Sequence, residues 1–186
     1  MPVFIVMGPS GCGKTSIAAA MASHFRLPYA EADDFHSEAS QSKMRRGEPL
    51  TDADRLPWLL ELHRRVADWL AAGQDAVITC SALKRSYRRL LMTGRTDEAS
   101  AVSTDADASA VLFIHLAVPR ETLLARVAAR RGHFFPAGLV ESQLACLEPP
   151  DPAEEPAVLV DADRPEPAVL QAVIGAVAQR LQPHRF

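Results

Sequence analysis

The sequence predicts an α/β fold, a doubly wound parallel sheet of five strands flanked by helices, from two patterns that alternate along the chain. Short apolar runs occupy residues 3–7, 76–80, 111–116 and 158–160, and a weaker run lies at 29–30. Runs that are apolar at every position are typical of strands covered on both faces, as in a parallel sheet. Helical patterns lie between these runs. The alternation therefore indicates βαβ units with right-handed crossovers.

The helical segments are recognised by apolar residues spaced three and four apart. Within residues 55–72, Leu59, Leu62, Val66 and Trp69 repeat at this spacing and form one apolar helix face. Weaker patterns of the same kind predict helices at 14–25, 84–92, 120–131, 138–147 and 167–181. Residues 93–110 are rich in small and polar side chains, so we expect a flexible loop there. Residues 149–167 are rich in proline, so we expect irregular structure around the strand at 158–160.

Length and composition bound the architecture. The chain has 186 residues, of which 48% are apolar and 23% charged, so we expect one globular domain spanning residues 1–186. Its formal net charge of −3 argues against binding to nucleic acid or to an anionic membrane. No apolar run approaches the ~18 residues of a membrane span. The 3 cysteines are too scattered for a disulfide framework, and we expect a cytoplasmic protein.

A glycine-rich loop after the first apolar run carries the strongest functional signal. Its sequence, GPSGCGKT, matches the G-x-x-x-x-G-K-[ST] pattern of a phosphate-binding loop at every fixed position. In such a loop the backbone amides and the following helix N-terminus bind phosphate oxygens, the lysine contacts the β- and γ-phosphates, and the hydroxyl binds Mg²⁺. The residues predicted to hold ATP are Gly8, Pro9, Ser10, Gly11, Cys12, Gly13, Lys14 and Thr15, with Thr15 as the Mg²⁺ ligand.

Other features of the chain exclude several classes of phosphate-loop protein. It contains no asparagine, so it cannot carry the N-K-x-D guanine motif of GTPases. Motor and transport ATPases place an aspartate at the end of an apolar strand, whereas the run at 76–80 ends in Cys80. Asp161 follows another apolar run, but the residues after it, 163–165, indicate a loop near the nucleotide base. A small phosphotransferase fits best.

A phosphotransferase needs a base for the attacking hydroxyl, and two acidic residues after the second apolar run are candidates. Glu31 and Asp33 follow the run at 29–30, at the carboxyl edge of the predicted sheet beside the phosphate loop. Residues two apart in an extended segment share a side, so both can face the site. We expect Asp33 to accept the substrate proton and Glu31 to hold Mg²⁺ through water. The alternative is an acidic turn that binds no ligand.

Two arginines are candidates for stabilising charge on the transferred phosphoryl group. Arg126 and Arg130 are four residues apart, so one helix face presents both guanidinium groups. Residues 131–136 then interrupt the helix, and we expect residues of about 126–147 to form a small helical lid over the phosphates. Catalytic roles are therefore predicted for Lys14, Arg126 and Arg130 besides Asp33. A solvated helix face is the alternative for the two arginines.

Several separated blocks make the sequence resemble the gluconate kinase (gluconokinase) family, small P-loop kinases related in fold to shikimate and adenylate kinases. The most specific blocks are GEPLTDADR before PWL at 47–59, CSALK at 80–84 and RRGHFF at 130–135, in this order. Shorter matches include Ser142-Gln143 and a LEP block at 147–149. The resemblance runs from Ile5 to about Pro165, nearly the whole chain.

The resemblance implies an adenylate-kinase-like P-loop NTPase fold and phosphorylation of the 6-hydroxyl of D-gluconate by ATP and Mg²⁺, giving 6-phospho-D-gluconate and ADP. It also implies Asp33 as the base, substrate-binding helices at about 36–72, and a homodimer. The substrate-binding candidates are Asp33, His36, Arg45, Arg55, Ser81, Lys84 and His133. Arg55 has the strongest physical case, because a guanidinium binds a carboxylate through two parallel hydrogen bonds. Its alternative is an ion pair with Asp52 or Asp54 at the helix start.

Some positions depart from the family's pattern. Ser40 stands where the family usually has asparagine, and Glu31 where aspartate is common. Both lie in the substrate region, so two alternatives stay open: a kinase of another small hydroxy acid or sugar acid, and a nucleotide-binding regulator without catalysis. A regulator would need the phosphate loop, but it would not need the carboxylate, the arginines and the acid-binding residues together.

Overall fold

The strands form one parallel sheet, as predicted. The computed structural model describes residues 1–96, 110–129 and 137–181. Its strands are β1 (Val3–Met7), β2 (Tyr29–Glu31), β3 (Ala76–Cys80), β4 (Val111–Ala117) and β5 (Ala157–Asp161). They lie in the order β2-β3-β1-β4-β5, and every neighbouring pair is parallel. The chain therefore crosses over between strands through helices, which is the doubly wound arrangement.

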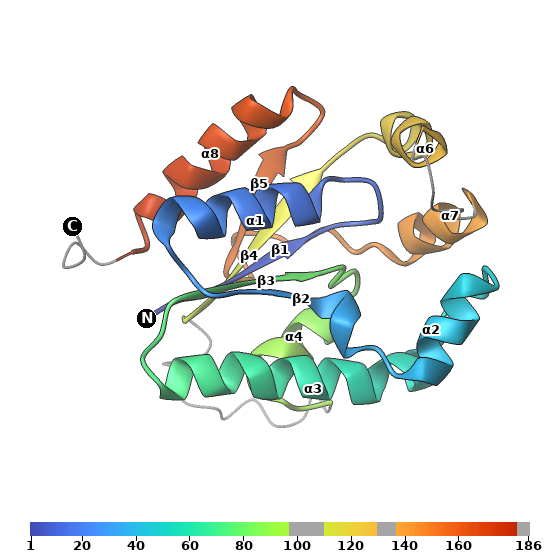
Figure 1. Ribbon diagram of the computed structural model, residues 1–186, viewed down its shortest axis with the longest axis horizontal. Coiled ribbons are helices and arrows are strands. Elements are labelled where there is room, and N and C mark those ends of the chain that lie inside the picture. The colour runs from blue at the N-terminus through green and yellow to red at the C-terminus, as the bar shows by residue number, and fades with distance from the viewer. Residues whose placement is uncertain (97–109, 130–136, 182–186) are drawn as a thin grey trace.

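Helices cover both faces of the sheet (Figure 1). α1 (Lys14–Phe25) and α8 (Glu166–Ala178) pack on one face, and α3 (Asp52–Ala71) and α4 (Arg85–Thr93) pack on the other. Every residue of β1 has 0% exposure, which is why this central strand is apolar throughout rather than at alternate positions. The apolar stripe predicted within 55–72 faces the core, where Leu59, Leu62, Val66 and Trp69 are all buried.

The remaining helices gather at the carboxyl ends of the strands (Figure 1). They are a 3-10 helix (Ala32–Phe35), α2 (Glu38–Arg45), α6 (Arg120–Ala128) and α7 (Ala137–Cys146). Ligands of open parallel sheets bind outside the carboxyl ends of the strands. This end of the molecule is therefore where the predicted site residues should meet.

Two elements near that end differ from the expectation. α3 begins at Asp52 because Thr51 and Asp54 form a capping box, in which the Thr51 hydroxyl accepts from the Asp54 amide at 3.2 Å and Asp54 Oδ2 accepts from the Thr51 amide at 2.9 Å. Strand β2 ends at Glu31, so Asp33 lies in the 3-10 helix rather than in an extended segment. The argument from alternation along a strand is therefore wrong for Asp33, and its direction is set by the helical turn.

Two further expectations concern segments without regular structure and the membrane. Helix α4 extends to Thr93, the first residue of the loop predicted at 93–110. Residues 97–109 of that loop lie outside the described residues. Among the residues that the structure covers, no helix combines the length and the apolar character needed to cross a membrane.

Candidate active site

The phosphate loop bends at positions where a side chain would be strained. Gly8, Gly11 and Gly13 have φ angles of 139°, 88° and 97°, a region that residues with a Cβ rarely adopt. A Cβ on Gly11 would also lie 2.8 Å from Cγ2 of Val127. Gly13 precedes α1 without supplying a side-chain cap, so the first amides of this helix are left for another acceptor. The loop and the helix N-terminus together fit a bound phosphate.

The Lys14 ammonium binds backbone carbonyls of the phosphate loop. Its Nζ donates to the carbonyl oxygens of Gly8 at 3.0 Å and Pro9 at 3.1 Å. The amide of Ser10 donates to Oε1 of Gln143 at 2.7 Å, which joins α7 to the phosphate loop. The predicted lid helix therefore contacts the loop directly, through a side chain that was not among the predicted site residues.

Thr15 and Glu31, the predicted Mg²⁺ residues, are neighbours. The Thr15 hydroxyl donates to Glu31 Oε2 at 3.4 Å. The same carboxylate accepts a 2.6 Å hydrogen bond from the Thr79 hydroxyl and another from the Tyr29 hydroxyl. These contacts come from α1, β2 and β3 and fix the orientation of Glu31. A hydroxyl and an oriented carboxylate are oxygen donors of the kind that Mg²⁺ prefers.

A cavity extends from the phosphate loop toward α2 and α3. Asp33, His36, Arg55 and Ser81 all line it, together with Glu31 and the phosphate loop. Asp33 is exposed, so its carboxylate is open to a molecule entering the cavity. The structure thus brings together a carboxylate, an imidazole, a guanidinium and a hydroxyl that the sequence predicted separately.

His36 is a buried titratable group of this cavity. It is 7% exposed, its ring stacks on Trp58 with centroids 4.2 Å apart, and its Nδ1 has no hydrogen-bond partner among the described residues. Burial lowers the pKa of His36 below its usual 6.5; Asp33 opposes this shift and Arg55 adds to it. The lowered pKa favours the neutral imidazole, in which one ring nitrogen is a donor and the other an acceptor.

Arg55 forms no salt bridge with a carboxylate of the described residues. Its Nε donates to the Leu50 carbonyl at 3.3 Å, and its guanidinium lies 6.0 Å from the centre of the Tyr87 ring. The two aspartates beside it in the sequence have other partners. Asp52 accepts from Lys84 at 2.7 Å, and Asp54 accepts from Lys43 at 2.7 Å. Neither aspartate forms a salt bridge with Arg55 in the described structure, although the charge of Arg55 contributes to the lowered pKa of Asp52. Arg55 lines the cavity.

Three predicted residues lie away from this cavity. Lys84 is held by Asp52 and lies 5.4 Å from the Tyr87 ring centre, and Arg45 is exposed and donates to Gln41 at 3.0 Å. Arg126 donates to the Ala162 carbonyl at 2.9 Å. None of the three lines this cavity, and their roles at the substrate and at the transferred phosphoryl group stay predictions. Lys84 and Arg126 bind groups far away in sequence, whereas Arg45 binds Gln41 one turn earlier on α2.

Two other predicted residues, Arg130 and His133, lie outside the described residues, as does the 130–136 segment of the expected lid. Their roles stay predictions.

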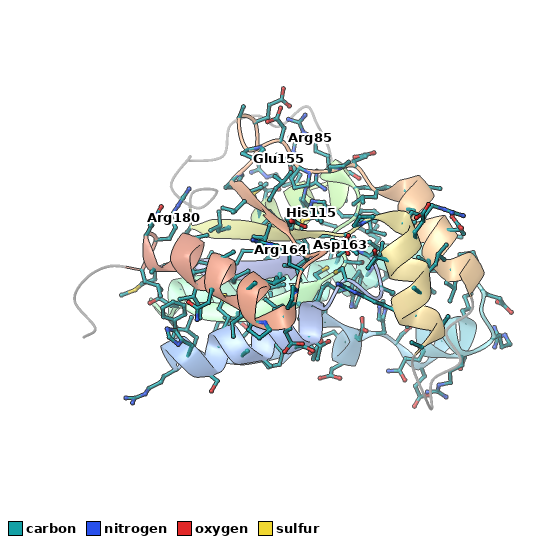
Figure 2. The ribbon with its side chains drawn as sticks, turned by 90° about the horizontal axis from the view of Figure 1, so that it is seen from above. Arg85, His115, Glu155, Asp163, Arg164 and Arg180 are labelled. Carbon is teal, nitrogen blue, oxygen red and sulfur yellow. The ribbon has the colours of Figure 1, made fainter. Side chains whose placement is uncertain are left out.

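Arg126 instead lines a second cavity on the other side of the phosphate loop. Gly11, Cys12 and Gly13 form one side of it, and Arg164 and Glu166 at the start of α8 form another. Asp163 and Arg164 belong to the loop between β5 and α8 (Figure 2). This is the loop that the sequence placed near the nucleotide base. The two cavities meet at the phosphate loop, since Gly11 and Gly13 line both.

Sequence reasoning missed Trp58, Thr79 and Gln143, each of which supports a predicted residue through a hydrogen bond or a ring contact. Trp58 and Gln143 stand in the blocks that carry the family resemblance, so their positions were marked without a role. Nothing in the local sequence marks Thr79, because it lies inside an apolar strand. Its partner becomes visible only when β2 and β3 are paired.

The structure defines a P-loop kinase of small molecules: it has a parallel sheet in this strand order, a phosphate loop between β1 and α1, and an aspartate in the adjoining cavity.

The comparisons with known proteins agree with this class. A family model described as an AAA domain matches residues 3–150. The chain is 39% identical over 180 residues to a "Probable gluconokinase" of Rattus norvegicus, covering 94% of this chain and 97% of that protein. It is 41% identical over 170 residues to a gluconokinase of Gluconobacter oxydans, covering 91% and 88%.

Solved structures extend the comparison. A gluconokinase from Sinorhizobium meliloti matches with a TM-score of 0.80 at 34% identity, covering 96% of this chain and 93% of that one. A sugar kinase from a Janibacter species matches with a TM-score of 0.82 at 39% identity, covering 96% and 95%. The chain belongs to the gluconokinase family.

Proposed function

We propose that this protein transfers the γ-phosphoryl group of MgATP to the 6-hydroxyl of D-gluconate, giving 6-phospho-D-gluconate and ADP. The observation that carries the proposal is the cavity beside the phosphate loop, where Asp33, His36 and an Arg55 without a carboxylate partner converge. The substrate named for the family relatives is a sugar acid, which has one carboxylate and a row of hydroxyls. The cavity offers a partner for each kind of group.

For the nucleotide, the loop amides and Lys14 would hold the phosphates, Thr15 would bind Mg²⁺, and Glu31 would hold the ion through water. Bound Mg²⁺ supplies charge neutralisation for the β- and γ-phosphates. Lys14 must leave the carbonyls of Gly8 and Pro9 to reach a phosphate oxygen, and a flexible ammonium can make this exchange. The second cavity, between Arg126 and Arg164, is the place for the nucleotide base.

For the acceptor, Asp33 takes the proton of the 6-hydroxyl as the oxygen attacks phosphorus. Its exposed carboxylate lines the cavity at the phosphate loop, where a base must lie within hydrogen-bond reach of the hydroxyl. Arg55 binds the carboxylate at the other end of the substrate through its planar guanidinium. His36 and Ser81 bind the intervening hydroxyls.

The part of the lid outside the described residues completes the site in this proposal. In this proposal Arg130 binds the transferred phosphoryl group and His133 binds the substrate; both residues lie outside the described part of the chain. The contact between Gln143 and Ser10 supports a role for α7 at the phosphates, because it joins this helix to the phosphate loop. We further expect the enzyme to act in the cytoplasm as a homodimer, which size-exclusion chromatography with light scattering can measure.

The test is a coupled ADP-release assay with a panel of acids and MgATP. Gluconate should give the highest kcat/KM, and sugar acids that lack a free 6-hydroxyl should give no turnover because no attacking oxygen is present. Preference for another hydroxy acid would favour the alternative kinase. An absence of turnover with every acid, despite binding of MgATP, would favour the nucleotide-binding regulator.

A further inference from the structure

Trp58 lines the cavity beside the phosphate loop, but its indole has no role in the proposed reaction. The residue lies on α3, three positions after Arg55, and is only 4% exposed. A buried aromatic residue of this kind usually packs in the core. Here the Trp58 indole makes one hydrogen bond, to Ala32, and one stacking contact, with His36. Both partners belong to the segment that carries Asp33.

The first contact is at the start of the 3-10 helix. Trp58 Nε1 donates to the Ala32 carbonyl at 2.7 Å, and the Ala32 amide donates to the Thr79 hydroxyl at 3.3 Å. The peptide groups on both sides of Ala32 are therefore held, one by α3 and one by β3. Asp33 is the next residue, so the path of its backbone is set by these two bonds.

The second contact is at the end of the same helix. The Trp58 ring lies on His36 with an interplanar angle of 12° and centroids 4.2 Å apart. His36 follows the 3-10 helix directly and is itself buried, with an unpartnered Nδ1 in the described structure. One indole thus holds the segment before Asp33 and the ring after it.

The need for such a support follows from the topology. β2 has only three residues, lies at the edge of the sheet and pairs with β3 alone. A short edge strand holds the segment after it weakly, because one side of its backbone is unpaired. A reacting carboxylate, by contrast, must stay within a few tenths of an ångström of its working position.

We propose that Trp58 is a positioning residue that holds Asp33 at the attacking hydroxyl and His36 against the substrate. The inference rests on the proposed function, since it assigns Trp58 to the placement of the proposed base. Arg55 and Trp58 lie three residues apart on α3, so the group that binds the substrate carboxylate and the group that holds the base belong to one rigid helix. Substrate bound to Arg55 is thereby set at a fixed distance from Asp33.

The first experiment compares Trp58→Phe with Trp69→Phe. Phenylalanine at 58 keeps an aromatic ring against His36 but cannot donate to Ala32. We expect kcat with gluconate to fall roughly 10- to 100-fold, as for a small misplacement of a reacting group, while the KM for MgATP stays within about twofold. Trp69 is the matched control, because it is a buried tryptophan of the same helix whose ring lies 4.4 Å from the Arg65 guanidinium, far along α3. Trp69→Phe should retain the wild-type kcat.

A second measurement does not depend on the stability of the Trp58 variant. The chain has 2 tryptophans, so Trp69→Phe leaves Trp58 as the only indole. Saturating gluconate should change its fluorescence, because the ring lines the cavity and stacks on His36. Trp58→Phe, in which only Trp69 emits, should show no such change.

The outcomes separate the two proposals. A kcat that is the same in the two variants, or a Trp58 emission unaffected by saturating gluconate, would overturn the role of Trp58 while leaving the gluconate kinase activity intact. If Trp58→Phe fails to fold, the fluorescence of Trp69→Phe decides alone. Wild-type enzyme that does not turn over gluconate would instead overturn the proposed function.

Discussion

Lowering the pH should unfold this protein partly through one buried histidine, His115. It lies in β4, is 4% exposed, and its Nδ1 has no hydrogen-bond partner among the described residues. Burial lowers the pKa of His115 from 6.5 to about 4, and the positive charge of Arg88 adds to the shift. Arg88 is itself buried and held by Glu155 through bonds of 2.6 and 2.7 Å. Figure 2 shows His115 in the interior and Glu155 toward the edge of the molecule.

The sign and size of the effect follow from these two pKa values. Above about pH 6.5 the ring is neutral in both states, so His115 adds no pH dependence. Between about pH 6.5 and 4, His115 is protonated in the unfolded chain but neutral in the folded protein. The free energy of unfolding therefore falls as the pH falls. The loss reaches about 1.4 kcal/mol at about pH 5.5 and about 3 kcal/mol below about pH 4.

The assay is urea unfolding at about pH 7.5 and about pH 5.5 for wild type and His115→Leu. Between these two pH values the wild type should lose about 1.3 kcal/mol more than the variant, which has no ring to protonate. His24→Gln is the control, because His24 is exposed on α1 and its ring meets solvent in both states. An equal loss in wild type and His115→Leu would refute the reasoning, since the buried ring would then carry no proton linkage.

Three further predictions concern the site. Asp33→Asn should lower kcat by ~10²-fold or more, because the amide cannot accept the proton, and should leave MgATP binding measured by calorimetry unchanged. Arg55→Ala should raise the KM for gluconate ~10-fold or more and leave that for MgATP unchanged, measured by steady-state kinetics. Gly11→Ala should weaken MgATP binding roughly tenfold, because its φ of 88° strains a Cβ and the Cβ meets Val127 at 2.8 Å.

Each of these has a contrary result. Near-normal turnover by Asp33→Asn would remove Asp33 as the base. Equal changes in both KM values would move Arg55 out of the acid-binding site. Wild-type nucleotide affinity in Gly11→Ala would mean that the loop relaxes without losing its phosphate contacts, and Gly138→Ala, where a Cβ meets nothing within 4 Å, supplies the comparison.

Much of the fold could be predicted because its signals are local. The apolar runs at 3–7 and 76–80 coincide with β1 and β3, which are buried along their whole length. β2 was the weakest prediction, and the structure explains why: its three residues are only half-buried at the sheet edge, so no continuous apolar run is needed there. The 3-10 helix after it leaves no periodicity to detect, since it has four residues.

The positions of site residues were predictable where the family's motifs mark them. The partners of charged side chains were harder to predict. Asp33, His36, Arg55 and Ser81 meet in one cavity as expected. Arg126 does not reach it, because its guanidinium binds the carbonyl of Ala162, 36 residues away in sequence. Helical spacing shows which residues share a face, but it does not show what that face meets.

The phosphate loop is the part of this protein that the amino-acid sequence determines by itself. Its function resides in backbone amides and in glycine φ angles, which depend on residues that are adjacent in the chain. The acid-binding group is the part that only the tertiary structure decided. Asp52 and Asp54 lie just before Arg55 in sequence, yet the fold pairs them with Lys84 and Lys43, from 32 and 11 residues away. Arg55 lines the cavity without a salt bridge to either aspartate, because packing rather than proximity along the chain assigns the partners of charged groups.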